Sequence, residues 1–281
     1  MIKYRMIYEQ LLKEGVVNRE DFLEPSEALD SEVLLVHDPQ WVEKLKRGSL
    51  SNLEILTLEI PYSEELVKET WLCAGGTILT CKHALNDGIC IHLGGGFHHA
   101  FPDHGEGFCL LNDIAIGIRK LCLDGDIERA MIIDCDLHQG NGTAYIFARD
   151  ENVFTFSIHQ ENNYPAVKER SDLDIGLEDG TTDEEYLTLL SAHIPRIVES
   201  FRPELILYVA GADVYEDDQL GGLNLTMEGL KKRDELVIGE ALQNKIPIAC
   251  VLAGGYARKV EDTVNIHVNL VKVAKDLSLG G

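Results

Sequence analysis

The sequence has few basic residues and no long apolar run. It contains 25 Lys and Arg against 48 Asp and Glu, which gives a formal net charge of −23 at pH 7. Such an acidic surface repels phosphate backbones, so we expect no direct binding of DNA or RNA, whereas a cationic substrate or partner would suit it. The longest apolar runs are only as long as strands, and the N-terminal MIKYRMIYEQ lacks the continuous apolar core of a signal peptide. We therefore expect no membrane span and a cytoplasmic protein.

Disulfide patterns and domain linkers are also missing. The seven cysteines are an odd number without a C-x-x-C motif, which fits a reducing compartment. No Pro-, Ser- or charge-rich linker and no internal repeat divides the 281 residues, and this length suits one large α/β domain. We expect a single domain over residues 1–281, and the sequence leaves its oligomeric state open.

Short apolar runs with strand character alternate with helical patterns along the chain. Ser63 and Thr226 are suited to cap helices, and Thr182-x-x-Glu185 is a capping box. Strands that alternate with helices predict βαβ units and a mostly parallel sheet. Apolar and polar residues alternate enough in the segment 53–61 to predict a further strand. The predicted helices cover about 64–84, 111–123, 183–200, 227–243 and 260–276.

Polar side chains suited to catalysis follow four of the apolar runs directly. They stand in GGGFHHAF at 94–101, DCDLHQGNG at 134–142, GAD at 211–213 and AGGY at 253–256. In an open parallel α/β sheet, ligands bind outside the carboxyl ends of the strands, so these four segments should meet at one edge. The side chains expected there are His98, His99, Asp136, His138, Asp213 and Tyr256.

Asp136, His138 and Asp213 are candidate ligands of one metal ion. Asp136 and His138 are alternate residues, which point the same way in an extended chain, and Asp213 ends a different strand. A lone D-x-H pair is more often a solvated aspartate and a structural histidine, but its combination with the other segments favours metal binding. Three protein ligands leave one position open, as in catalytic zinc sites, and a carboxylate-rich set also accepts iron(II).

A site with two carboxylate ligands needs a separate general base, because the carboxylates cancel the charge of the metal ion. His98 and His99 are the candidates for this base. Asp134 and Asn141 flank the metal-ligand pair and are placed to orient the two histidines. Tyr256, after two glycines at a strand end, is a candidate donor to a developing oxyanion. A half-buried surface tyrosine is the common alternative for such a Gly-Gly-Tyr.

Over nearly its whole length the sequence resembles the histone deacetylase family, and within it the class IV group and its bacterial relatives. The resemblance runs from Lys3-Tyr4-Arg5 through VHDPQWV at 36–42 to the last predicted helix, and its longest motifs are GGGFHHAFPDHGEGFCLLND and DCDLHQGNGTAYIF. It implies the arginase/deacetylase fold, a three-layer α/β/α arrangement with a mostly parallel central sheet. The implied activity is zinc-dependent removal of acetyl or longer acyl groups from lysine side chains of proteins or peptides.

The resemblance also implies roles for single residues. Zn²⁺ would be bound by Asp136, His138 and Asp213. His99 would be the principal general base and acid, with His98 as an electrostatic neighbour held by Asp134, and Tyr256 would be the transition-state tyrosine.

Two further sites are implied in the same way. Gly107 and Phe108 match one wall of an acyl-lysine tunnel, with Tyr164 and Leu220 as further walls. A structural potassium ion would use the side chains of Asp134 and Ser157. Its remaining ligands would be the backbone carbonyls of Asp134, Asp136, His138 and Ile158.

Two features of the sequence depart from the usual family pattern. Asn141 stands where many members have aspartate, although class IV members also have asparagine. A neutral partner raises the pKa of His99 less than a carboxylate does, so we expect His99 to be neutral at pH 7. Only Met1 and Ile2 precede the Lys-Tyr-Arg segment, so we expect a wider pocket mouth that admits bulkier acyl groups, and an exposed sheet edge that favours association.

Three alternatives stay open on the sequence. A deacetylase of acetylated polyamines or other small amides would also suit the acidic surface. A two-metal ureohydrolase is disfavoured, because Gly140 stands where that group has a second aspartate. A non-catalytic acyl-lysine binding protein could keep the pocket, and turnover of an acetyl-lysine peptide would exclude it.

Overall fold

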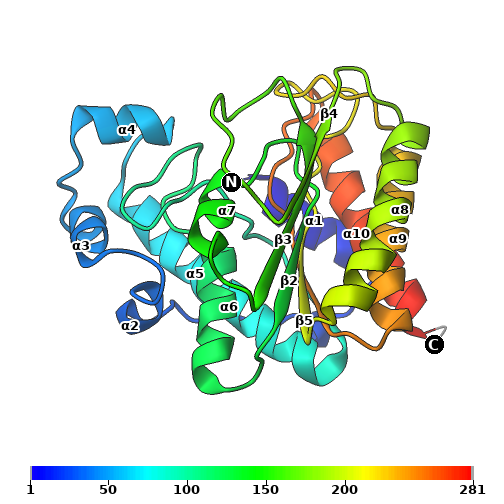
Figure 1. Cartoon of the computed structure of the whole chain (residues 1–281), viewed down its shortest axis with the longest axis horizontal. Helices are drawn as coiled ribbons and strands as arrows, with labels where there is room; N and C mark the ends of the chain where they lie inside the picture. Colours follow the sequence, from blue (N-terminus) through cyan, green and yellow to red (C-terminus); the bar gives the residue numbers. More distant parts are fainter. Residues whose placement is uncertain (1, 280–281) are drawn as a thin grey trace.

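A six-stranded sheet runs through the centre of the computed structural model, which describes residues 2–279 (Figure 1). All of its neighbouring strands pair in parallel, in the order β1-β6-β5-β2-β3-β4. The strands are β1 (Ile89–His92), β2 (Ala130–Asp134), β3 (Val153–Gln160), β4 (Leu173–Leu177), β5 (Leu205–Val209) and β6 (Ile248–Val251).

Helices cover both faces of this sheet, so the predicted three-layer α/β/α arrangement is confirmed (Figure 1). Successive strand residues point to opposite faces. In β2, Ile132 packs into the core beneath α5 (Glu64–Asp87), α6 (Asp113–Asp124) and α7 (Asn141–Phe147), whereas Ile133 packs into the opposite core. That second layer consists of α1 (Ile2–Lys13), α8 (Asp183–Phe201), α9 (Met227–Gln243) and α10 (Val260–Leu279).

The segment 53–61, predicted as a strand, is instead largely helical. Helix α4 (Asn52–Leu58) begins after Ser51, whose hydroxyl accepts a hydrogen bond from the Glu54 N–H, while the Glu54 carboxylate accepts one from the Ser51 N–H. This capping box overrides the weak alternation. The short helices around it are η1 (Arg19–Asp21), α2 (Asp30–Val33) and α3 (Pro39–Arg47), and a separate apolar cluster joins α2, α3 and α4 to α5.

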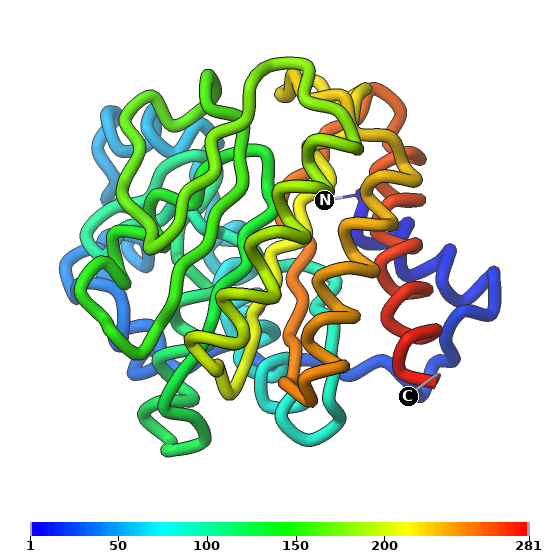
Figure 2. The backbone as a smooth tube through the Cα atoms, turned by 45° about the vertical axis from the view of Figure 1, so that its right-hand side comes forward, coloured from blue at the N-terminus to red at the C-terminus, as the bar shows by residue number. Residues whose placement is uncertain are grey.

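The other helix predictions are confirmed within a few residues. The Ser63 and Thr226 side chains cap α5 and α9 by accepting backbone N–H groups three residues later. The box of Thr182 and Glu185 opens α8. Helix α1, for which no bounds were predicted, lies beside α10 although the two stand at opposite ends of the chain (Figure 2).

The parallel strands bring their carboxyl ends to one edge. The loops that follow β1, β2, β5 and β6 carry the four polar segments, and the register pairs Asp134 at the end of β2 with Val209 of β5 and Ser157 of β3. Among the helices of residues 2–279, none is both long and apolar enough to cross a membrane.

Candidate metal centre and active site

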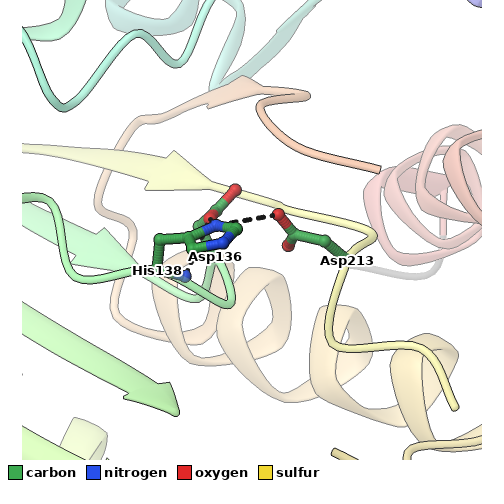
Figure 3. Close-up of side chains that lie close together, drawn as sticks. All are labelled: Asp136, His138 and Asp213. Atoms are coloured by element: carbon green, nitrogen blue, oxygen red, sulfur yellow. Dashed lines mark hydrogen bonds and ion pairs between the residues drawn. The ribbon is translucent and has the colours of Figure 1, made fainter. Parts of the chain in front are cut away.

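Asp136, His138 and Asp213 converge beyond the ends of β2 and β5 (Figure 3). One potential ligand atom from each lies within 4.8 Å of the others. His138 Nδ1 is 3.2 Å from Asp136 Oδ1 and 3.5 Å from Asp213 Oδ2. The sequence-predicted ligand set is therefore brought together by two loops that follow neighbouring strands of the sheet.

The remaining bonds of the two carboxylates leave room for a cation. Asp136 Oδ2 accepts the N–H of Gly254 at 3.0 Å, and Asp213 Oδ1 accepts the N–H of Leu137 at 3.0 Å. The other oxygen of Asp213 is buried and has no hydrogen-bond partner among the described residues. A buried carboxylate oxygen without a hydrogen bond is costly unless a proton or a metal ion binds it, so this donor set fits a divalent ion.

Glycine at position 254 is required for this arrangement. A Cβ there would lie 1.9 Å from Asp213 Oδ2 and 2.7 Å from Asp136 Oδ2. Any larger residue would therefore push into the space between the carboxylates. The loop that carries Tyr256 thus also closes one side of the candidate metal site.

The charges around His138 favour a positive charge at the candidate metal site. Burial acts to lower the pKa of His138, but the nearby carboxylates of Asp136 and Asp213 outweigh it and raise the pKa to about 10. A histidine must be neutral to bind a metal, so a dication bound here would take the place of that proton. The negative charges of the two carboxylates would attract such a dication.

Arg233 holds the two ligand loops from behind, a role that no motif in the sequence indicates. Its guanidinium is fully buried and donates to the carbonyl oxygens of Cys135 and Gly211, at 3.3 and 2.6 Å. The Asp234 carboxylate balances its charge, with Arg233 Nη2 at 2.9 Å from Asp234 Oδ1. A buried arginine on a helix forms no local motif, so only the tertiary structure reveals this contact.

The two histidines of the first segment have different partners. His98 Nδ1 lies 2.7 Å from Asp134 Oδ2, and His99 Nδ1 lies 2.7 Å from Asn141 Oδ1. All four side chains are buried. The structure therefore places Asp134 and Asn141 beside the two histidines, in contact with the nitrogens that an orienting partner would bind.

The surroundings of the two imidazoles move their pKa values in opposite directions. Burial acts to lower the pKa of His98, but the charges of Asp134 and Asp136 outweigh it and raise the pKa to about 9. Burial lowers the pKa of His99, and the charges of His98 and His138 lower it further, so it lies well below its ordinary value. These surroundings thus favour a protonated His98 and a neutral His99 at pH 7.

The loop before the histidines is fixed by Asp113 at the start of α6. Its carboxylate accepts the N–H groups of Gly96 and Phe97, at 3.1 and 2.7 Å. Gly96 has φ of 91°, and a Cβ there would lie 2.6 Å from Ala253 Cβ. Glycine is needed because the histidine loop and the tyrosine loop touch at this point.

Tyr256 lies on the last of the four loops, and 37% of its surface is exposed. Its backbone N–H donates to Asp218 Oδ2 at 2.6 Å, a contact that the sequence did not reveal. The Lys3 ammonium lies 5.5 Å from the Tyr256 ring centroid. Burial and the charges of Asp213 and Asp136 raise the pKa of Tyr256, so the hydroxyl keeps its proton and can donate a hydrogen bond.

One cavity of about 1040 Å³ joins these groups to the surface. The four predicted tunnel residues line it together with His99 and Tyr256. The ring of Phe108 is 6.0 Å from that of Tyr256, and the ring of Tyr164 is 4.9 Å from that of His99. The other two predicted tunnel residues are Gly107 and Leu220.

Residues 1–271 match the family described as Histone deacetylase domain. The chain is 41% identical over 277 residues to a protein of Picosynechococcus sp. described as uncharacterized, with 99% of this chain and 92% of that protein covered. It is 33% identical over 277 residues to histone deacetylase 2 of Arabidopsis thaliana, with 93% and 71% covered. It is 32% identical over 253 residues to the acetoin utilization protein AcuC of Staphylococcus aureus, with 82% and 64% covered. The chain therefore belongs to the histone deacetylase family.

Proposed function

We propose that this chain is a zinc-dependent hydrolase that removes acyl groups from lysine side chains. Family membership supports a deacetylase-type hydrolase. The observation that carries the proposal is the buried group of Asp136, His138 and Asp213 in the same cavity as a neutral His99 and the Tyr256 hydroxyl. These are a metal site, a base and an oxyanion donor, which hydrolysis of an unactivated amide requires.

Each protein group has a separate task in this reaction. A divalent ion, when bound, supplies Lewis-acid activation of water and of the scissile carbonyl. His99 takes a proton from the attacking water and later delivers it to the leaving amine. Tyr256 donates a hydrogen bond to the oxygen that gains negative charge. His98, held cationic by Asp134, adds positive charge next to the reacting centre.

A potassium ion behind this site belongs to the same proposal. The register that pairs Asp134 with Ser157 supports it, because both side chains are buried side by side on neighbouring strands. The carbonyls of Asp134, Asp136, His138 and Ile158 would complete the ligand set. Omitting potassium from a carefully desalted protein, then adding it back, tests this part through thermal stability.

A small cationic amide is a second candidate substrate. Glu59, Glu65 and Glu69 line the cavity and favour a substrate that carries further ammonium groups. Acetylated polyamines and acetyl-lysine peptides rich in basic residues share this chemistry. Both are amides of a primary amine, so the same site would hydrolyse either.

Turnover by the zinc-loaded protein tests the proposal. The panel should contain acetyl-, butyryl- and longer acyl-lysine peptides beside acetylated polyamines, with kcat/KM as the measure. Turnover of the peptides supports lysine deacylation, and turnover of polyamines alone would transfer the proposal to the second candidate. Binding of these compounds without any turnover would identify a non-catalytic acyl-lysine binding protein.

A further inference from the structure

Glu106 lies directly behind the pair of His99 and Asn141. Asn141 Nδ2 donates a hydrogen bond to Glu106 Oε1, while Asn141 Oδ1 faces His99 Nδ1. Only 16% of the Glu106 side chain is exposed. The three residues therefore form a chain from a carboxylate, through an amide, to the candidate base.

The surroundings of Glu106 keep it ionised. Burial acts to raise its pKa, but contacts with His104, Asn141 and Tyr164 outweigh this and hold the pKa below its ordinary value. His104 Nε2 is 3.8 Å from Glu106 Oε2. An ionised carboxylate can accept hydrogen bonds but cannot donate one.

This property decides the orientation of the Asn141 amide. The end of the amide that faces Glu106 must be the NH₂ group, because a carboxylate needs a donor there. The other end, which faces His99 Nδ1, is then the carbonyl oxygen. That oxygen accepts a hydrogen bond, so Nδ1 of the neutral imidazole must carry the proton.

We propose that Glu106 is a positioning residue that fixes the productive tautomer of His99 through the Asn141 amide. With the proton on Nδ1, the Nε2 atom keeps a free lone pair and can accept a proton from water. If the side chain at position 106 could also donate a hydrogen bond, the Asn141 amide could exchange its two ends. Its NH₂ group would then face His99 Nδ1 and select the opposite, unproductive tautomer. The proposal rests on the proposed function, in which His99 is the base.

The loop itself does not need the Glu106 side chain. Its backbone is held by the bond from the Cys109 N–H to the Glu106 carbonyl at 2.9 Å. The N–H groups of Gly107 and Phe108 also donate to the carbonyls of Thr57 and Leu58, at 3.3 and 3.0 Å. The substitution Glu106→Gln keeps the side-chain length and changes only the charge and the obligate acceptor, so it separates positioning from folding.

Nitrogen-15 NMR of histidine-labelled, zinc-loaded protein tests the tautomer without any turnover. The His99 signals are assigned from their loss in a His99→Gln variant. We expect Nδ1 to resonate as a protonated nitrogen and Nε2 as an unprotonated one, and we expect Glu106→Gln to mix the two forms. An unprotonated Nδ1 in the original chain, or unchanged signals in the variant, would overturn the proposal. If these spectra are as expected but no amide is hydrolysed, only the proposed function fails.

The kinetics of single variants, followed by a double variant, give the second test. Glu106→Gln should lower kcat by about 10- to 100-fold with a smaller change in KM. Glu151→Gln removes an exposed carboxylate outside the cavity and should leave kcat unchanged. Melting temperature and zinc content should be alike in all variants, which shows that folding is not the cause.

The effect of Glu106→Gln on kcat should change from a loss to a gain when Asn141 is replaced by aspartate. The introduced carboxylate would enforce the Nδ1 proton by itself, whereas an ionised Glu106 beside it would repel it. In the Asn141→Asp background, Glu106→Gln should therefore raise kcat. An equal loss in both backgrounds would show that Glu106 acts only as a general structural residue.

Discussion

The Nδ1 atom of His99 lies 2.7 Å from the Oδ1 atom of Asn141, inside a buried pocket where His98 is the adjacent cation. An amide orients the imidazole without adding negative charge. The pKa of His99 therefore stays well below its ordinary value, because burial and the charge of His98 both lower it. His99 is therefore unprotonated at neutral pH, as a general base must be before it accepts a proton.

Replacing Asn141 by aspartate should move the acidic limb of the pH–rate profile to higher pH. A carboxylate at hydrogen-bond distance favours the imidazolium, so the pKa of His99 should rise. Because protonated His99 cannot act as the base, activity should then be lost at a higher pH on acidification. The profile of kcat/KM measures the shift, and the Glu106→Gln background shows it without a competing carboxylate. An unmoved limb would mean that His99 is not the base.

Removing one carboxylate ligand should remove the metal. Asp213→Ala or Asp136→Ala leaves two protein ligands, and we expect zinc content to fall from about one ion per chain and activity to be lost. Asp217→Asn is the matched control, since this exposed carboxylate stands on the same loop as Asp213 and is not part of the ligand group. Elemental analysis of the purified proteins gives the answer. Full activity of a metal-free preparation would contradict the mechanism.

Gly254→Ala should damage the metal site without touching a ligand. The added methyl group would lie 1.9 Å from Asp213 Oδ2, so the carboxylates must move apart and zinc affinity should fall. Gly239→Ala is the control inside α9, where a methyl group has no neighbour closer than 4.0 Å. The control should gain about 0.5–1 kcal/mol of stability and keep its zinc. Thermal melting and a zinc titration distinguish the two, and normal zinc affinity in Gly254→Ala would show that the loop relaxes freely.

The layers and the position of the site could be predicted from the sequence because both follow from short-range patterns. Apolar runs followed directly by GGGFHH or DCDLH identify strand ends, and parallel strands bring such ends to one edge. The strand predicted for 53–61 was wrong. The hydrogen bonds between Ser51 and Glu54 stabilise a helix start there more than alternation of apolar and polar residues stabilises an isolated strand.

Contacts between distant loops could not be predicted in this way. Glu106 reaches Asn141, and Arg233 reaches two ligand loops, over separations that no local pattern encodes. The sequence showed that Asn141 is neutral, but not that a carboxylate lies behind it. Charged side chains in loops and helices are usually solvated, so these two stood out only once their burial was known.

Tyr256→Phe should lower kcat while the metal site stays intact. The change removes one hydrogen-bond donor to the oxyanion and keeps the aromatic ring, and the loss of one such donor typically costs about 10²–10³-fold in rate. The raised pKa of Tyr256 keeps its hydroxyl protonated, so the loss should be the same across the neutral pH range. Tyr8→Phe, on a ring that packs against Phe22 and lies outside the cavity, is the matched control. Zinc content and KM should change little, and wild-type turnover by Tyr256→Phe would reduce this tyrosine to a part of the cavity wall.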